Sequence, residues 1–189
     1  APFTLHKQML AHIQRVAQAA SAGRPARVVA KINALTDVPL IGALIKAAQA
    51  GAIIDLIVRG ACMLPPGIEG VTDRIRVRSV VGRFLEHSRV LYFRWGEASA
   101  QAAAEGVVEE ALFLSSADWM GRNMFGRIEV AWPVRDAALR QRIIDECLVP
   151  YLHDRLDAWL LAADGSYSPV GGAAPSAQQA LISRCAQSR

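Results

Sequence analysis

The arrangement of a strand, a helix and a second strand in immediate succession constrains the fold of this chain most. Residues 26–32 form a short β-branched segment, as expected for a strand. Thr36 or Asp37 can cap the following helix, and Pro39 suits its first turn. Residues 52–58 then form a near-continuous apolar run, which is typical of a strand buried in a parallel sheet. We therefore predict a βαβ-like unit within an α/β domain.

The hydrophobic periodicity elsewhere predicts further elements around this unit. We expect one domain over residues 1–189, with a mixed β-sheet flanked by helices. Pro150 should end or kink the helix that precedes it. We expect residues 59–72 to form a loop. Residues 97–110 are expected to form an exposed excursion between two strands. The expected helices are 5–20, 82–86, 136–149, 151–161 and a last one capped by Ser176, and the expected strands are 74–80, 90–95, 111–114 and 127–132.

Composition and charge restrict the class of protein. The chain has 189 residues, of which 52% are hydrophobic and 20% charged, so it is long and apolar enough to bury a sizeable core. Its net charge of +4 favours anionic partners, but the sequence has no recognisable nucleic-acid-binding motif. Cys62, Cys147 and Cys185 have no zinc-binding spacing, so no metal site is expected and a reducing cytoplasm is the default. No signal peptide or membrane span is visible, and the missing initial Met suggests a piece of a longer protein.

Six arginines surround a single histidine, His87, between residues 74 and 94. Arginine presents a planar fork of donors that matches phosphate oxygens, and histidine can carry or relay a proton near neutral pH. The cluster therefore suggests chemistry on a phosphate-rich anion, with a solvated strand face as the simpler alternative. Alternation places three of them on one strand face, where they could track a polyphosphate or merely form a solvated edge. The six are Arg74, Arg76, Arg78, Arg83, Arg89 and Arg94.

Arg59 lies at the end of the most buried predicted strand and opens a loop rich in Pro and Gly. Ligands of open α/β sheets collect beyond the carboxyl ends of the strands. Arg59 is therefore expected to bind phosphate oxygens, although an arginine in this place could instead cap the strand end by bonding loop carbonyls.

Ser115, Ser116 and Asp118 follow another predicted strand. They could orient His87 or a bound anion, or they could form an ordinary helix N-cap. The order His-x-Arg followed by Ser-Ser-x-Asp is similar to the phospholipase D pattern. Phosphodiesterases of that type need two copies of their motif and this chain has one degenerate copy, so we do not expect phosphodiester hydrolysis by this chain alone.

Five motifs in the same order carry a more specific resemblance. They are KINAL (31–35), LIVRGAC (56–62), SVVGRFLEHSR (79–89), LSSADWMGRN (114–123) and RIEVAWP (127–133). Together they resemble the C-terminal domain of class 1 bacterial polyphosphate kinases over nearly the whole chain. The resemblance implies a phospholipase D-like fold and reversible transfer of the terminal phosphate of ATP to inorganic polyphosphate, with Mg²⁺.

The resemblance also implies partners and residue roles. The phosphorylated histidine would belong to a preceding domain, so upstream domains of the same polypeptide are expected partners, as are ATP, ADP and polyphosphate. We expect a homo-oligomeric full-length enzyme, cytoplasmic or peripheral to the inner membrane face, and an inactive isolated chain. A non-catalytic polyanion-binding module is the alternative. Arg59 and His87 match the nucleotide-contacting residues of the family, with His87 as the catalytic candidate. The supporting candidates are Lys31, Asn33, Arg83, Arg89, Ser115, Ser116, Asp118, Arg122 and Asn123.

Overall fold

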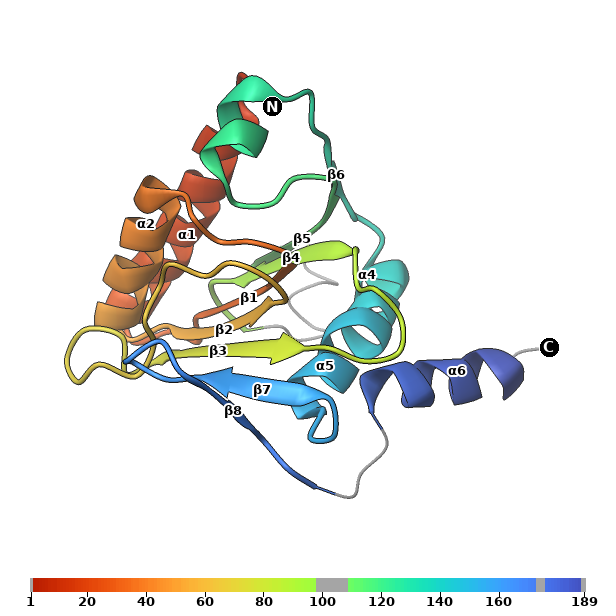
Figure 1. The fold of residues 1–189 in the computed structure, drawn as a ribbon. Coiled ribbons are helices and arrows are strands. Elements are labelled where there is room, and N and C mark those ends of the chain that lie inside the picture. The colour runs from red at the N-terminus through yellow and green to blue at the C-terminus, as the bar shows by residue number, and fades with distance from the viewer. Residues whose placement is uncertain (1, 98–108, 173–175, 188–189) are drawn as a thin grey trace.

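A single mixed β-sheet runs through the molecule, with helices on both of its faces (Figure 1). The computed structural model describes residues 2–97, 109–172 and 176–187. In this part of the chain the sheet has eight strands in the order β6-β5-β4-β1-β2-β3-β7-β8. The strands are β1 (Arg27–Ile32), β2 (Ile53–Val58), β3 (Ile75–Val80), β4 (Arg89–Arg94), β5 (Glu110–Ser115), β6 (Ala131–Pro133), β7 (Ala158–Leu161) and β8 (Tyr167–Pro169).

The centre of the sheet is parallel and its flanks are antiparallel. Strand β2 pairs in parallel with β1 and β3, whereas β4 and β7 add antiparallel strands on either side. The register of the central pair runs from Arg27 opposite Ile53 to Ile32 opposite Val58. These strands carry apolar residues on both faces, because helices cover the sheet on each side. The prediction of a mixed sheet flanked by helices is confirmed.

Helices α1 (Leu5–Ser21) and α2 (Val38–Gln49) cover one face of the sheet. The side chains of α1 that recur at helical spacing, including Met9, Ile13 and Val16, are fully buried in the core. Helix α2 begins as the sequence indicates, because the Asp37 carboxylate accepts a hydrogen bond from the Leu40 amide at 3.0 Å. Both helix predictions and the βαβ unit are confirmed.

The opposite face of the sheet is covered by the second half of the chain. Helix α4 (Ala137–Ile143) continues through a π-helical turn, η2 (Ile144–Leu148), into α5 (Val149–His153). The helical segment before Pro150 ends as expected, because η2 stops at Leu148 and α5 begins at Val149 with Pro150 in its first turn, where a proline needs no amide partner. The predicted helix over residues 151–161 is wrong beyond His153, since the chain turns there into β7. Helix α6 (Ala177–Gln187) follows, with the Ser176 hydroxyl accepting from the Gln179 amide as a cap.

Three further expectations need correction. Residues 82–86 are not helical but belong to an irregular segment that joins β3 to β4. The strand predicted over 127–132 forms only at Ala131–Pro133, because the residues before it follow a π-helical turn, η1 (Arg122–Gly126). Leu139, expected on the buried face of the helix predicted over residues 136–149, is exposed. Most of the predicted excursion over 97–110 lies outside the described residues.

The arginines of β3 contact protein groups, and the side chain of Arg76 is also 64% exposed. Strand β3 lies between β2 and β7, so it is not an edge strand. Arg76 and Arg27 both donate to the buried Asp55 carboxylate, at 2.9 and 2.6 Å. Arg78 donates to the Tyr151 and Asp154 carbonyls. Arg74 precedes the strand. Polyphosphate binding by this row stays a prediction.

Candidate functional site

Several of the predicted site residues gather where the parallel strands end. The segment after β1, the loop after β2 and the segment after β5 meet at the carboxyl edge of the sheet. Leu35 forms isolated β-bridges with Cys62 on one side and Trp119 on the other. The Trp119 amide donates to the Ala34 carbonyl at 3.1 Å, and the Gly60 amide donates to the Asn33 carbonyl at 2.8 Å. Backbone bonds therefore fix three distant segments against one another at this edge.

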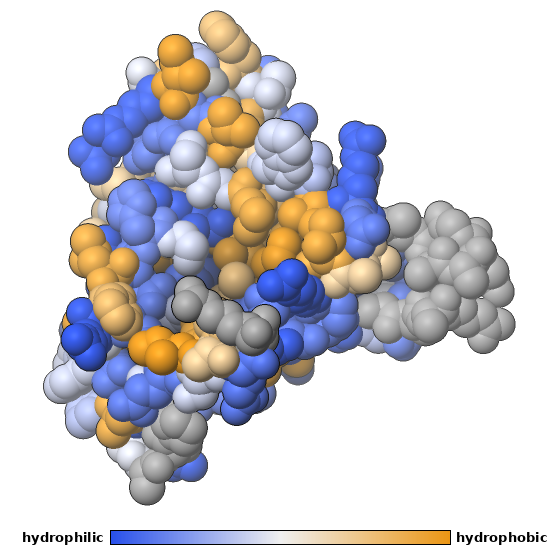
Figure 2. Space-filling model, turned by 90° about the vertical axis from the view of Figure 1, so that its right-hand side faces the viewer, coloured by the Kyte–Doolittle hydropathy of each residue, from blue (hydrophilic) through white to orange (hydrophobic). Residues whose placement is uncertain are grey.

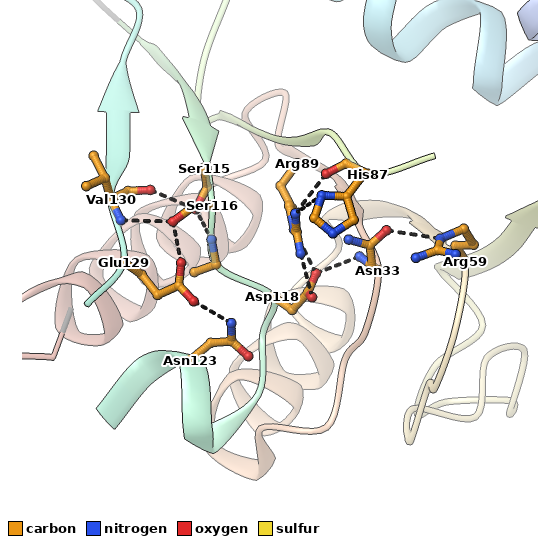
Figure 3. Close-up of polar contacts among 11 residues, drawn as sticks. Asn33, Arg59, His87, Arg89, Ser115, Ser116, Asp118, Asn123, Glu129 and Val130 are labelled. Carbon is orange, nitrogen blue, oxygen red and sulfur yellow. Dashed lines mark hydrogen bonds and ion pairs between the residues drawn. The ribbon is translucent and has the colours of Figure 1, made fainter. Parts of the chain in front are cut away.

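A buried ion pair joins the start of β4 to the segment after β5. Arg89 donates from Nε to Asp118 Oδ1 at 3.1 Å and from Nη2 to Asp118 Oδ2 at 2.9 Å (Figure 3). The two side chains are only 10% and 9% exposed. Burial raises the pKa of the Asp118 carboxyl, but the bonds from Arg89 and the Asn33 amide outweigh it and leave that pKa below its ordinary value. Asp118 is therefore a fixed anion that orients Arg89.

Arg89 in turn holds His87. Its Nη1 donates to the His87 carbonyl at 2.8 Å and lies 2.9 Å from His87 Nδ1. A guanidinium can only donate, so Nδ1 accepts, and the neutral imidazole carries its proton on Nε2. Within the described part of the chain, Nε2 has no hydrogen-bond partner, and His87 is exposed. The ring is thus oriented at one nitrogen and available to a ligand at the other.

Arg59 reaches the same group from the end of β2. Its Nε donates to the side-chain oxygen of Asn33 at 3.1 Å, and the backbone amide of Asn33 donates to Asp118 Oδ1 at 2.7 Å (Figure 3). Among the described residues, the two terminal nitrogens of Arg59 and the buried Nδ2 of Asn33 have no hydrogen-bond partner. A chain of contacts therefore links Arg59 to His87 through Asn33, Asp118 and Arg89. The terminal nitrogens of Arg59 at one end and Nε2 of His87 at the other are unpaired donors among the described residues.

Lys31 lies beneath this group in a small pocket that Asn33 and Arg59 also line. Its ammonium donates to the Glu86 carboxylate at 2.8 Å and to the Ser88 hydroxyl at 2.6 Å, and it lies 4.4 Å from the centre of the Tyr151 ring. Burial raises the pKa of Glu86, but the bonds from Lys31, Gln178 and Tyr151 outweigh it and lower that pKa. The buried ammonium is therefore paired with a carboxylate that immediately precedes His87.

The two serines form a separate group that does not contact His87 or Arg59. The Ser115 hydroxyl donates to the Val130 carbonyl at 3.3 Å, and the Ser116 hydroxyl bonds the Glu129 carboxylate (Figure 3). Asn123 donates to the same carboxylate at 2.7 Å. These contacts hold the loop before β6 against the end of β5. The serines therefore neither cap a helix N-terminus nor bond His87 directly. A site role for them stays a prediction.

Arg83 and Arg122 are exposed on two irregular parts of the chain. The Arg83 guanidinium lies over the Phe84 ring at 5.6 Å, and Arg122 lies in η1. Neither contacts the group around Asp118. Sequence reasoning missed Glu86, Tyr151 and Gln178, since the last two come from α5 and α6. The position of Glu86 directly before His87 was the one available signal.

The site suits an anion rather than a bare metal ion. Its two carboxylates, Asp118 and Glu86, are each paired with a buried or nearly buried cation. No cluster of three His, Cys, Asp or Glu side chains suited to a metal ion occurs among the described residues. The groups that remain available are donors, on Arg59 and His87. Preorganised donors of this kind bind phosphate oxygens.

A wider groove lies elsewhere and has a different character. It runs between β6 and α4, and Figure 2 views the molecule from this side, where apolar side chains form a group on the surface. Trp132 and Leu139 in the groove are 68% and 53% exposed. The groove contains none of the predicted site residues, and its lining is mainly apolar, so it does not suit a phosphate chain.

In the described residues, no helix has the length and apolar character required to cross a bilayer.

Comparison with known proteins identifies the family. The family described as polyphosphate kinase C-terminal domain 2 matches residues 1–180. A polyphosphate kinase from Pseudomonas aeruginosa is 50% identical over 185 residues, which are 96% of this chain and 25% of that protein. One from Paraburkholderia phytofirmans is 46% identical over 185 residues, or 97% and 25% of the two chains.

A solved structure agrees with the sequence relatives. The crystal structure of polyphosphate kinase from Porphyromonas gingivalis matches with a TM-score of 0.88 and 34% identity, covering 100% of this chain and 28% of that one. The expected phospholipase D-like fold is thereby confirmed. The chain spans about a quarter of the length of the curated relatives it matches. It belongs to the polyphosphate kinase C-terminal domain family.

Proposed function

We propose that this chain forms part of the active site of a polyphosphate kinase, which transfers the terminal phosphate of ATP reversibly to inorganic polyphosphate. The relatives described above carry that name. The observation that carries the proposal is the line of contacts from Arg59 to His87, which leaves donors unpaired at the carboxyl edge of the sheet. Phosphoryl transfer depends mainly on positioning and on neutralising charge, and such donors supply both.

Arg59 is proposed to bind phosphate oxygens of the nucleotide or of polyphosphate. Its Nε bond to Asn33 restrains the guanidinium and leaves the two terminal nitrogens without a partner among the described residues, so they can act as a fork. Because Asn33 is itself tied to Asp118, the fork is positioned before any ligand arrives. Preorganisation of this kind lowers the free-energy cost of binding a charged transition state.

His87 is proposed to donate from Nε2 to an oxygen of the transferred phosphate. Because Arg89 occupies Nδ1 as a donor, the lone pair on that nitrogen is engaged. This arrangement favours a hydrogen-bond donor over a nucleophile, so the phosphoryl-accepting histidine is assigned to an upstream domain of the same polypeptide. The remaining candidates, Lys31, Asn33, Arg89 and Asp118, are proposed to hold these two residues in place.

Mg²⁺ is proposed to arrive with ATP rather than to occupy a site of this chain. The carboxylates near Arg59 are already paired with Arg89 and Lys31, so the residues present do not fit a magnesium ligand set. When bound to the nucleotide, the ion would neutralise charge on the phosphates. We assign none of this chain's residues to it.

Two substitutions of His87 in the full-length enzyme test its role. The side-chain amide nitrogen of glutamine can occupy roughly the place of Nε2, whereas that of asparagine is too short to reach it. We expect His87→Gln to keep more of the rate of polyphosphate synthesis than His87→Asn, with the exposed His153→Gln as a control of unchanged rate. Equal loss in both variants would show that proton transfer, not donation from Nε2, is the function of the ring. Near wild-type rates in both would contradict the proposal.

A further inference from the structure

The segment that carries His87 depends on distant parts of the chain for its shape. Residues 81–88 join β3 to β4 without regular secondary structure, and they also carry Arg83. An irregular segment holds one conformation only where its polar groups find fixed partners. In this molecule many of those partners come from the C-terminal part of the chain, beginning with the Asp157 carbonyl, which accepts from the Val81 amide at 3.0 Å.

Gln178 of α6 binds this segment at three points. Its Oε1 accepts from the Phe84 amide at 2.9 Å, and its Nε2 donates to the Phe84 carbonyl at 2.8 Å. The same nitrogen donates to the Glu86 carboxylate at 2.8 Å. Gln178 is 6% exposed, so its side of these bonds is shielded from solvent. The amide of this one side chain thus reproduces the pairing that a neighbouring strand would give to Phe84.

The close approach of Gln178 requires a glycine opposite it. A Cβ added at Gly82 would lie 2.6 Å from Gln178 Oε1 and 2.8 Å from Asp157 Oδ2. Both distances are below van der Waals contact, so a side chain at residue 82 would displace the amide from Phe84. Gly82 has no positive φ, and its backbone conformation therefore gives no separate reason for a glycine.

Glu86 extends the contact toward the site. Besides Gln178, its carboxylate accepts from the Tyr151 hydroxyl at 2.9 Å and from Lys31 at 2.8 Å. Lys31 also donates to Ser88, so the residues on both sides of His87 are held by one network. The network includes a side chain from α6, one from α5 and one from β1.

Helix α6 is itself fixed to the body of the domain at its first residues. The Ala177 amide donates to Asp154 Oδ2 at 2.7 Å, and Ser176 and Ala177 are each 2% exposed. Gln178 therefore extends from an anchored helix end. The later residues of α6 are mostly exposed, so the contacts at its first turn are the ones that reach the segment carrying His87.

We propose that Gln178 is a positioning residue for His87, and that α6 and Glu86 hold segment 81–88 in the conformation that phosphoryl transfer requires. The inference rests on the proposed function of His87. It assigns to the C-terminal helix an indirect part in the active site. Gln178 bonds Phe84 and Glu86, and it acts on His87 through the segment that these residues share with it.

The test compares two neighbouring glutamines in the full-length enzyme. Gln178→Ala removes all three bonds to the segment, whereas Gln179→Ala removes the exposed partner of the Ser176 amide and weakens only the start of α6. We expect Gln178→Ala to lower kcat at least about tenfold, since small misplacement of a catalytic group is costly. Hydrogen exchange of a peptide covering residues 81–88 should become faster in this variant. Gln179→Ala should leave both kcat and the exchange rate of this peptide close to their wild-type values.

Two further variants separate positioning from helix stability. In Gln178→Glu, a protonated carboxyl group can accept from the Phe84 amide and donate one of the two bonds that Gln178 Nε2 donates, but an ionised carboxylate only accepts. The kcat of Gln178→Glu relative to wild type should therefore rise as pH falls. Gly82→Ala should lower kcat in the wild-type background and have a smaller effect combined with Gln178→Ala, because the nearer of the two oxygens that the added Cβ meets is then gone and only Asp157 Oδ2 remains.

The outcomes decide between the possibilities. Equal loss of kcat in Gln178→Ala and Gln179→Ala, with equal falls in Tm, would show that α6 acts only through stability and would overturn the inference. Wild-type kcat in Gln178→Ala alongside an inactive His87→Asn enzyme would overturn it while leaving the proposed function intact. Wild-type rates in the His87 variants would instead remove the proposed function on which the inference rests.

Discussion

Arg89 and Asp118 form a two-bond ion pair, with nitrogen–oxygen distances of 3.1 and 2.9 Å, that joins β4 to the segment after β5. The pair is nearly inaccessible to solvent, and it holds both His87 and the Asn33 backbone. It therefore connects the two ends of the proposed phosphate-binding group. A buried pair of this kind determines geometry even where its net contribution to stability is small.

Loss of one partner should cost more than loss of both. We expect Asp118→Ala to destabilise the chain by about 3 kcal/mol, because Arg89 would remain buried without a counter-charge. Asp118→Leu combined with Arg89→Met should recover part of that loss, since no unpaired charge remains. Urea unfolding of Asp118→Ala, of the double variant and of its two component single variants, Asp118→Leu and Arg89→Met, measures the difference. A double variant as unstable as the sum of its single changes would contradict a direct coupling between the two side chains.

The acid side of the stability curve should depend on the same carboxylate. The pKa values of Asp118 and Glu86 lie below their ordinary values in the folded chain. Groups with lowered folded pKa values contribute stability above their unfolded pKa values, about 3.9 and 4.3, and lose it as pH falls through the folded values. Asp118→Asn should therefore show a shallower loss of stability below about pH 4 than wild type.

Urea midpoints at several pH values between about 2 and 5 would measure this slope. The exposed Asp73→Asn serves as the control. A slope for Asp118→Asn that matches wild type below about pH 4 would show that the carboxylate is not held by Arg89 in solution.

The isolated chain should not make polyphosphate from ATP. His87 is oriented as a donor by Arg89, and the phosphoryl-accepting histidine is assigned to an upstream domain. Incubation of residues 1–189 with ATP labelled at the γ-phosphate should give no stoichiometric label on the protein and no labelled polymer. Stable labelling at one group per chain would show that this domain carries the phosphoryl acceptor.

Local sequence patterns predicted the elements that place Arg59, but not all the contacts around it. The βαβ unit and the Asp37 cap follow from apolar runs and cap chemistry that act within a few residues. The end of α5 at His153 could not be read in this way, because the turn into β7 depends on pairing with β3, far away in the sequence.

The site shows the same division between local and distant information. Arg59, His87 and Asp118 were predicted as site candidates from their positions at strand ends and from the family resemblance. Gln178 carries no signal in the sequence, because its importance comes from an irregular segment more than ninety residues away that packs against it. The serines look like a cap by composition, yet they bind the loop before β6.

The central claim is that Arg59 binds phosphate in the active site of the full-length enzyme. Loss of one charged donor from a preorganised site costs roughly 3 kcal/mol, so Arg59→Ala should reduce kcat for polyphosphate synthesis about a hundredfold. Arg59→Lys should recover little, because lysine replaces neither the planar fork nor the bond to Asn33. Arg142→Ala, an exposed arginine of α4, is the matched control and should keep the wild-type rate.

Steady-state synthesis of polyphosphate by these three full-length variants is the most direct measurement of that claim. The predicted result is strong loss in both Arg59 variants, with unchanged circular dichroism and an unaffected control. Wild-type turnover in Arg59→Ala would contradict the claim. It would show that Arg59 has only a structural role, through its hydrogen bond to Asn33 at the end of β2.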